Sequence, residues 1–337
     1  MKKNLLFLLV RPFYSHSGWV QYGDTFKVWK INEFEFQLVH NLKKADIILI
    51  PYPINYYYCN SKMNLIRCYD NLCDKYNIRA FGYISGDGGM QYPEFRNITY
   101  FRMGGNRSKL SAKNRGMPAA LTDQYKKLYG TEKIIFRKKK SKPVVGFCGH
   151  ATSSPLIYLY QNYKYLIENF KRFINDFNRR DYEPIFPSAF MRHRVMKYLE
   201  QENMIITNFI YRKKYRAGAK SQKDLQSTTL EYYENLLDSD YILCIRGAGN
   251  FSIRLYETLM VGRIPIFVNT DCILPFEEQI EWKSHAVWVE WDQIKHINEI
   301  ILNFHNQLTS KNFYDLQAAN RNLWVTRLQP FSILQNL

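Results

Sequence analysis

Residues 241–268 read YILCIRGAGNFSIRLYETLMVGRIPIFV, with two apolar runs on either side of a glycine-rich turn and an amphipathic segment. The run Tyr241–Ile245 is short and apolar, which is typical of a buried strand. Ser252–Val261 has apolar residues at helical spacing, and Ile264–Val268 is a second apolar run. This order predicts a strand–helix–strand unit with parallel strands, and ligands bind outside the carboxyl ends of such strands.

The same alternation continues on both sides of this unit. Further strands are expected at Leu5–Val10, Ile47–Ile50, Arg79–Ile84, within Glu94–Met103 and at Val144–Cys148. Helices are expected at Phe34–Leu42, Ile157–Phe177, Arg192–Glu200, Thr229–Leu237 and Asn312–Trp324. Short apolar runs that alternate with amphipathic stretches predict an α/β chain with parallel sheets.

The length of 337 residues predicts about two domains. The segment Arg137–Pro143 is polar, basic and closed by proline, so the linker is expected there. We therefore predict an N-terminal domain of residues 1–138 and a C-terminal domain of residues 139–310. Residues 311–337 are expected to form a C-terminal helical segment, which could pack back on the N-terminal domain.

The formal net charge of +17 concerns partners more than fold. Basic residues cluster in Arg137–Lys140 and in Arg212–Arg216, but neither run has the spacing of a nucleic-acid-binding module. No nucleic-acid partner is therefore predicted. Each run is interpreted either as a solvated basic face or as a contact for an anionic membrane or an anionic acceptor.

The six cysteines contain no C-x-x-C pair, and Cys148 and Cys244 lie in apolar runs. This pattern favours buried free thiols in a reducing compartment over disulfides or a zinc site. The apolar run after Met1 has six residues before Arg11, which is too short for a signal peptide or a membrane span. A cytoplasmic protein is predicted, and peripheral contact with a membrane surface remains open as an alternative.

The turn between the first strand and the helix has the residue types of a phosphate-binding loop. Arg246 supplies a cation at the strand end, and Gly247 and Gly249 let the backbone approach a ligand closely. Ser252 is expected to cap the helix, whose N-terminal N–H groups and dipole favour a diphosphate. The alternative is an ordinary strand–turn–helix, since the glycines match only part of a dinucleotide fingerprint.

Arg254 and Glu257 are three residues apart and so share one face of the predicted helix. The arginine could bind phosphate in a bidentate manner, and the glutamate could accept hydrogen bonds from ribose hydroxyls. Gly262 stands where a helix-terminating glycine is expected. The residues predicted to bind the donor are Arg246, Gly247, Gly249, Asn250, Ser252, Arg254 and Glu257.

The block from Cys244 to Ile266, followed by Leu274-Pro275-Phe276 and Ile280-Glu281-Trp282, resembles the signature of the exostosin-like glycosyltransferases, family 47. Weaker similarities occur in the expected order at residues 45–52, 85–89 and 144–149. The resemblance touches most of the chain but is specific only over Tyr241–Trp282.

This resemblance implies a GT-B architecture, in which two Rossmann-like domains face each other across a cleft and the C-terminal one binds the sugar nucleotide. It implies an inverting, metal-independent transferase without cofactors, with UDP-sugars as the usual donors and a glycan or lipid-linked glycan as acceptor. Arg246 and Arg254 would then stabilise the leaving diphosphate, and Glu257 would bind the ribose. No metal site is expected.

An inverting transfer needs a base for the acceptor hydroxyl. Asp87, in the loop Ser85–Gly89, is the preferred candidate, and His16 is the second; either could instead be an ordinary loop residue. The competing functions are a GDP-sugar-dependent transferase such as a fucosyltransferase, a non-catalytic nucleotide- or glycan-binding scaffold, and a dinucleotide-dependent oxidoreductase. The last would need a glycine fingerprint after the first strand, where Arg11-Pro12-Phe13 stands.

Overall fold

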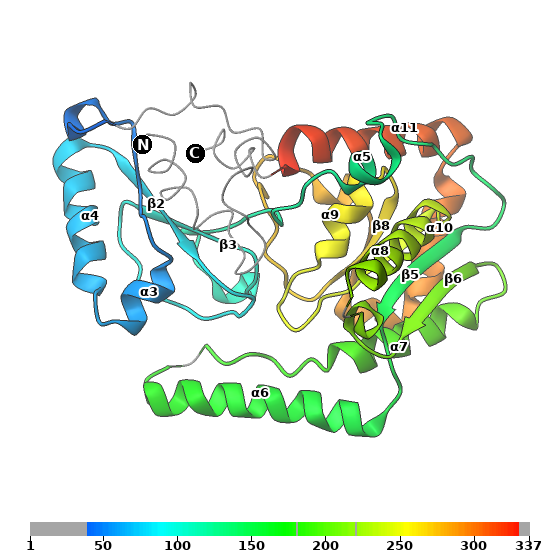
Figure 1. Ribbon diagram of the computed structural model, residues 1–337, viewed down its shortest axis with the longest axis horizontal. Coiled ribbons are helices and arrows are strands. Elements are labelled where there is room, and N and C mark those ends of the chain that lie inside the picture. Colours follow the sequence, from blue (N-terminus) through cyan, green and yellow to red (C-terminus); the bar gives the residue numbers. More distant parts are fainter. Residues whose placement is uncertain (1–38, 180, 220, 330–337) are drawn as a thin grey trace. The chain divides into compact units, whose positions relative to one another are not determined.

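A computed structural model describes residues 39–179, 181–219 and 221–329, and these form two compact units (Figure 1). The first unit comprises the described residues up to Thr122, the segment Asp271–Glu277 and the chain from Arg327 onward. The second comprises Asp123–Thr270 and Glu278–Thr326. The expected strand Leu5–Val10 and His16 lie outside the described residues, as does most of Phe34–Leu42.

The N-terminal unit contains one parallel sheet in the order β1-β2-β3-β4. Its elements are β1 (Ile47–Leu49), α3 (Ile54–Cys59), α4 (Met63–Tyr76), β2 (Arg79–Ile84), β3 (Ile98–Arg102) and β4 (Asn114–Gly116). Ile54 and Ile66 bring α3 and α4 into the same buried cluster as Ala80 and Ile98 of the sheet. The core of this unit therefore lies between the sheet and the two helices.

The segment Asp271–Glu277 joins the N-terminal unit although it follows a strand of the other unit. Asp271 accepts hydrogen bonds from the backbone N–H of Ser108 at 2.9 Å and from its hydroxyl at 2.6 Å. Pro275 forms a parallel bridge with Gly116, where a Cβ atom would lie 2.3 Å from the Leu274 carbonyl. Glycine at position 116 is therefore needed for this close backbone approach.

The C-terminal unit contains a five-stranded parallel sheet in the order β6-β5-β7-β8-β9. Its strands are β5 (Val144–His150), β6 (Ile206–Arg212), β7 (Tyr241–Cys244), β8 (Ile264–Asn269) and β9 (Val287–Glu290). Its α-helices are α5 (Gln124–Tyr129), α6 (Pro155–Asn175), α7 (Ser188–Glu200), α8 (Gln222–Leu237), α9 (Ile253–Met260), α10 (Ile297–Gln307) and α11 (Ser310–Leu323). Short 3-10 segments lie at Leu42–Lys44, Arg107–Lys109, Tyr215–Gly218, Trp282–Ser284 and Trp291–His296, and a π-helical turn at Trp324–Leu328.

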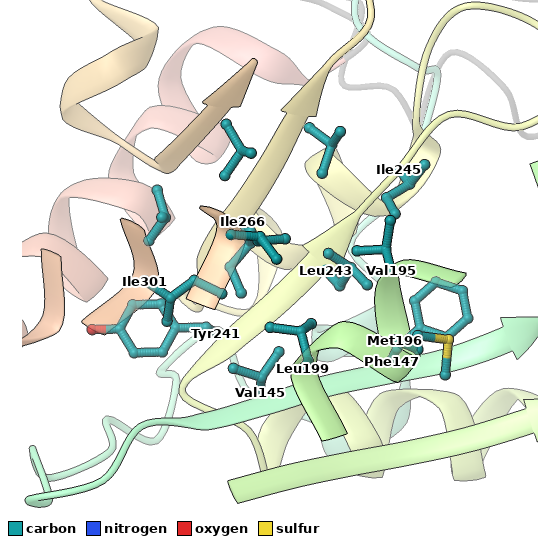
Figure 2. Packing of buried hydrophobic residues seen from close by; sticks show 14 of the residues in the cluster. Val145, Phe147, Val195, Met196, Leu199, Tyr241, Leu243, Ile245, Ile266 and Ile301 are labelled. Carbon is teal, nitrogen blue, oxygen red and sulfur yellow. The ribbon is translucent and has the colours of Figure 1, made fainter. Parts of the chain in front are cut away.

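The apolar runs of the sequence form the core of the C-terminal unit. Side chains of β5, β7 and β8 pack against α7 and α10, whereas α8 and α9 contact β5 and β8 respectively. Figure 2 shows Val145, Phe147, Leu243 and Ile266 from the strands with Val195, Met196 and Leu199 from α7. Because these strands are covered by helices, they carry continuous apolar runs and not the alternation of a half-exposed sheet.

Local sequence signals set the helix ends. Ser154 accepts a hydrogen bond from the backbone of Ile157, and Pro155 stands at the first position of α6, where its missing N–H costs nothing. Ser221 and Asp224 form a capping box at the start of α8. Gly262 follows α9 with φ +63°, so the expected helix-terminating glycine is confirmed.

The predicted α/β chain with parallel sheets is confirmed. The expected strands at Arg79–Ile84 and Ile264–Val268 and the helix expected at Ile157–Phe177 appear as β2, β8 and α6, with shifts of at most two residues at their ends. The structure also contains elements that were not predicted, namely α3, α4, α5, β4, β6, β9 and α10.

Two arginines of the basic runs do not belong to a solvated basic face. Arg137 donates to the Asp240 carboxylate at 2.5 Å, and the other carboxylate oxygen accepts from the backbone N–H of Val144 at 2.9 Å. Arg212 is buried and forms an ion pair with Glu231. The interpretation of these runs as partner-facing surface is therefore wrong for Arg137 and Arg212, which hold the C-terminal unit together.

All six cysteines are free thiols, as predicted, but only four are buried; the expectation of burial is wrong for Cys59 and Cys68, which are exposed. Cys148 and Cys244 are buried, and burial raises the pKa of their thiols to about 11 and about 12. Both thiols are therefore protonated and inert at neutral pH. Among the described residues, none of the helices has the length and apolar character needed to cross a bilayer.

Candidate functional site

The strand order of the C-terminal unit identifies the position of a ligand site. The first strand of this unit along the chain, β5, lies in the sheet between β6 and β7. The chain therefore continues from β5 toward one edge of the sheet and from β7 toward the other. Ligands of doubly wound sheets bind at such a reversal, outside the carboxyl ends of the two strands. Here those ends carry His150, the last residue of β5, and Arg246, two residues beyond β7.

The loop after β7 is held from inside by Arg246. This side chain is buried, its Nη2 donates to the carbonyl oxygen of Ala248 at 2.9 Å, and its guanidinium lies 5.1 Å from the ring centroid of Phe186. At Gly247 an added Cβ atom would meet a single side chain, that of Arg192, at 3.7 Å. The loop backbone at Gly247 therefore faces the guanidinium of Arg192.

Asn250 anchors the far end of the loop to the neighbouring strand. Its buried side chain donates to the carbonyl oxygen of Thr270 at 2.8 Å and accepts from the Thr270 hydroxyl at 2.7 Å. Because both polar atoms of the amide are engaged with the residue that follows β8, the loop has one well-defined conformation. Asn250 thus ties the loop after β7 to the end of β8.

Helix α9 begins directly after this loop. Ser252 occupies the N-cap position, but its hydroxyl makes no capping hydrogen bond in the described structure. The predicted capping hydrogen bond from Ser252 is therefore wrong, although Ser252 does stand at the N-cap position and the helix starts where expected. The N–H of Leu255 donates instead to the carbonyl oxygen of Ser252 at 3.1 Å, and the helix dipole favours an anion at this end of α9.

Arg254 lies in the first turn of α9 and reaches the end of β5. Its Nη2 donates to the carbonyl oxygen of Cys148 at 2.9 Å, and its guanidinium stacks 4.0 Å from the ring centroid of Phe147. A Cβ atom at Gly149 would lie 2.7 Å from the same Nη2, so glycine is what admits the guanidinium here. Arg254 is therefore a rigid cation at the carboxyl end of β5.

Glu257 lies one turn further along α9, on the same face as Arg254, as predicted. The Tyr232 hydroxyl donates to its Oε2 at 2.5 Å, and the Arg254 guanidinium lies 5.9 Å from the Tyr232 ring. Burial, and then the charge of Glu257, raise the pKa of Tyr232 well above its usual value, so the phenol stays protonated and donates. Tyr232 thereby fixes the orientation of the carboxylate.

Two further groups at this site, a guanidinium and an imidazole, were not predicted. Arg192 of α7 donates from Nη2 to the carbonyl oxygen of Ile245 at 3.2 Å, and its electrostatic neighbours are Arg254, Tyr232 and Tyr165. The charge of Arg192 in turn lowers the pKa of His150 at the end of β5. In sequence these residues are 42 positions apart and neither belongs to a recognisable motif, so only the folded chain reveals them.

This cluster has the electrostatics of an anion site. The Nε2 of His150 and the Nε atoms of Arg192 and Arg254 are buried and have no hydrogen-bond partner among the described residues. Burial, and then the charge of Arg254, lower the pKa of Arg192 to about 9. Burial, and then Arg192, lower the pKa of His150, which is therefore neutral at pH 7. Neighbouring buried nitrogens without a partner are the kind of groups that hydrogen bonds to an oxyanion such as a phosphate would stabilise.

Asp87 lies in the N-terminal unit, in the loop that follows β2. The buried Arg102 fixes this loop by donating to the carbonyl oxygens of Gly88 and Met90, each at 2.9 Å. Asp87 itself is exposed, and the backbone carbonyl of Asp87 would lie 2.3 Å from a Cβ atom at Gly104. The structure thus provides an ordered loop with an accessible carboxylate at the carboxyl end of β2.

Comparisons with known proteins bear on the segment that builds this site. Residues 178–304 match the Exostosin GT47 domain. The chain is 34% identical over 70 residues to a probable glucuronosyltransferase of Oryza sativa subsp. japonica, which covers 21% of this chain and 17% of that protein. It is 30% identical over 93 residues to exostosin-1 of Drosophila melanogaster, covering 27% and 12%. It is 31% identical over 70 residues to a probable beta-1,4-xylosyltransferase of Arabidopsis thaliana, covering 21% and 17%.

The fold is that of an α/β protein with parallel sheets, and the cluster at the reversal of the C-terminal sheet is a candidate oxyanion site. Residues 178–304 are similar to the Exostosin GT47 domain, and the aligned relatives are named exostosin or glycosyltransferases, so the predicted resemblance to family 47 is confirmed over this segment. The aligned segments span less than a fifth of the length of each of these three relatives.

Proposed function

We propose that this chain transfers a sugar from a nucleotide-diphosphate donor to a hydroxyl of a glycan, with the C-terminal unit binding the donor. The observation that carries the proposal is the cluster of Arg192, Arg254 and His150 at the sheet reversal, each with a buried nitrogen that has no partner in the part of the chain that the structure describes. A diphosphate matches this cluster, because its oxygens accept from several donors at once and its charge offsets the like charges of the arginines.

The remaining parts of the site fit the nucleoside. In the proposed complex the diphosphate lies over the first turn of α9, and the ribose hydroxyls donate to Glu257, whose orientation Tyr232 fixes. UDP is the proposed nucleotide, in line with the family resemblance. The relatives named glucuronosyltransferase and xylosyltransferase support a hexosyl or pentosyl donor.

The proposed reaction is an inverting displacement. The acceptor oxygen attacks the anomeric carbon, the bond from that carbon to the diphosphate breaks, and the acceptor proton passes to a carboxylate. Asp87 is the proposed base, because its loop is rigid and its side chain is accessible. Arg192, Arg254 and the N–H groups of α9 stabilise the charge that develops on the leaving diphosphate, so that the proposed transfer needs no metal ion.

The architecture proposed for this reaction is GT-B, with the parallel sheet of the N-terminal unit on the acceptor side. Such an arrangement assigns donor and acceptor to different units, which agrees with the distribution of Arg254 and Asp87 between them. The acceptor class proposed is a glycan or a lipid-linked glycan.

A ligand screen tests the donor assignment. Thermal unfolding of the chain is followed with UDP, GDP, CMP and their common sugar conjugates, and binding is then quantified by calorimetry. We expect UDP or a UDP-sugar to raise the melting temperature and release of UDP to accelerate when a glycan acceptor is added. Stabilisation by CMP-sugars alone would contradict the donor assignment, and binding without any donor turnover would favour a non-catalytic scaffold.

A further inference from the structure

Helix α6 carries a long row of exposed apolar side chains. Eight large apolar residues of α6, and Phe177 just beyond its end, are between 40% and 78% exposed. They are Leu156, Leu159, Tyr160, Tyr163, Leu166, Phe170, Phe173, Ile174 and Phe177. Because the eight helical residues recur mainly at steps of three and four, they form one face of the helix, and the Phe177 ring lies 5.1 Å from the ring of Phe173 on that face. We call this surface the α6 apolar face.

The opposite face of α6 is firmly attached to the C-terminal unit. Arg172 pairs with Glu183 at 2.9 Å, and Asn169 exchanges two hydrogen bonds with the backbone of Glu183, at 2.8 and 3.0 Å. The returning chain on both sides of residue 180 therefore covers this side (Figure 1). No described residue of the C-terminal unit covers the α6 apolar face to a comparable extent, as its exposure shows.

The size of the α6 apolar face sets it apart from ordinary surface. Side chains of this size present about 150–250 Å² each, so at the observed exposures the face offers on the order of 1,000 Å². The largest apolar patch on a soluble monomer is usually about 300–600 Å², and larger ones mark interaction sites. The face therefore calls for a partner that buries apolar side chains.

Lysines border the α6 apolar face. Lys164 and Lys171 are exposed and lie seven residues apart, along one margin of the face, and the Lys164 ammonium lies 4.7 Å from the ring centroid of Tyr160. The face itself contains two tyrosines, whose rings combine an apolar body with a polar tip. An apolar stripe with tyrosines and a basic margin is the pattern of a helix that lies in the interface of an anionic membrane.

We propose that the α6 apolar face docks onto the surface of an anionic lipid bilayer. The helix lies parallel to the membrane, its leucines and phenylalanines enter the boundary of the acyl chains, and Lys164 and Lys171 contact anionic headgroups. The formal charge of +17 strengthens attraction to such a surface and opposes pairing with a second copy of the same chain.

Docking at this face is connected to the candidate donor site by a direct contact. Tyr165, on the buried side of α6, donates from its hydroxyl to the carbonyl oxygen of Ala248 at 3.0 Å, within the loop after β7. A membrane-bound α6 would thus hold the donor loop close to the lipid surface, where lipid-linked acceptors lie. The docking itself does not depend on the proposed transferase activity.

Vesicle co-sedimentation tests the proposal. The full chain is mixed with vesicles of phosphatidylcholine alone or of phosphatidylcholine with 30–40% phosphatidylglycerol, on the order used for anionic leaflets. We expect binding to the anionic vesicles, at least tenfold weaker binding to the neutral ones, and a further loss at high salt. The double variant Leu159→Glu/Phe170→Glu is expected to lose binding by more than tenfold.

Leu230→Glu is the matched control, because Leu230 is an exposed leucine on α8 of the same unit. It is expected to bind vesicles like the wild type, and unchanged melting temperatures would show that all variants are folded. Lys164→Gln/Lys171→Gln is expected to weaken binding to anionic vesicles while leaving the apolar face intact.

Three outcomes would overturn the proposal. The first is a wild-type chain that does not sediment with anionic vesicles, and the second is equal binding by the double variant and Leu230→Glu. The third is a wild-type chain that dimerises in the absence of lipid and becomes monomeric in the double variant, which would make a second copy the occupant.

Discussion

Replacing Arg192 with methionine should weaken donor binding and at the same time raise the stability of the ligand-free chain. Methionine keeps an apolar stem of similar length and removes the guanidinium. Binding should weaken because a charge-assisted hydrogen bond to phosphate contributes about 1.5–3 kcal/mol. That range corresponds to roughly a 10- to 150-fold increase in the dissociation constant for UDP.

The stability effect has the opposite sign because of the surroundings of Arg192. Burial and Arg254 lower the pKa of Arg192 to about 9, so the charged form is unfavourable where it stands. The guanidinium remains protonated at pH 7, and this unfavourable charge is therefore fully present there. Removing it also sacrifices the long hydrogen bond to Ile245, about 0.5–1.5 kcal/mol. A net gain of about 1 kcal/mol would raise the melting temperature by roughly 2–4 °C.

Calorimetry with UDP and thermal unfolding without ligand measure the two effects on the same protein. Arg194→Met is the control, since Arg194 is an exposed residue of the same helix whose Nε donates to the Tyr198 hydroxyl at 2.9 Å. It should change neither quantity appreciably. UDP affinity within about twofold of wild type in Arg192→Met would refute the role of Arg192 at the phosphate. A fall of several degrees in melting temperature would show that Arg192 is a structural residue.

The other predictions concern four positions. Asp87→Asn should abolish transfer and leave UDP affinity unchanged; transfer at the wild-type rate would exclude Asp87 as the base. Glu257→Ala should weaken UDP binding by about 1–3 kcal/mol in calorimetry, and an unchanged affinity would disprove the ribose assignment. Because the pKa of His150 is lowered by burial and by Arg192, the unfolded chain binds more protons below about pH 6.5, so stability is lost as the pH falls. His150→Gln should therefore lose less stability than wild type in melts between pH 7 and 5, and identical slopes would contradict this. Gly149→Ala would place a methyl group 2.7 Å from Arg254 and should weaken UDP binding several-fold with little change in melting temperature; unaltered affinity would mean that Arg254 adjusts.

The candidate site was predictable from the sequence where it is built by neighbours along the chain. Arg254 and Glu257 share a helix, so their spacing alone places them on one face. The strand, the glycine loop and the helix of residues 241–268 were equally predictable, because apolar runs and a terminating glycine mark their boundaries.

The rest of the site depends on distances that no local pattern encodes. His150 and Arg192 come together with Arg254 only because β5 lies next to β7 in the sheet and α7 packs over both. The strand β6 was missed because its residues are mostly half-exposed and carry no continuous apolar run. The predicted cap by Ser252 failed because a serine before a helix permits the hydrogen bond but does not impose the rotamer.

The course of the chain between its two units restricts how this protein can be divided. The polypeptide passes from one unit to the other after Thr122, Thr270, Glu277 and Thr326. A fragment that ends at Thr122 therefore loses the bridge from Gly116 to Pro275 and the hydrogen bonds from Ser108 to Asp271. Exchanging the N-terminal unit between relatives by a single crossover would leave residues 271–277 of one parent against the sheet of the other. Recombination within such a family should consequently preserve these seven residues together with the distant sheet that they complete.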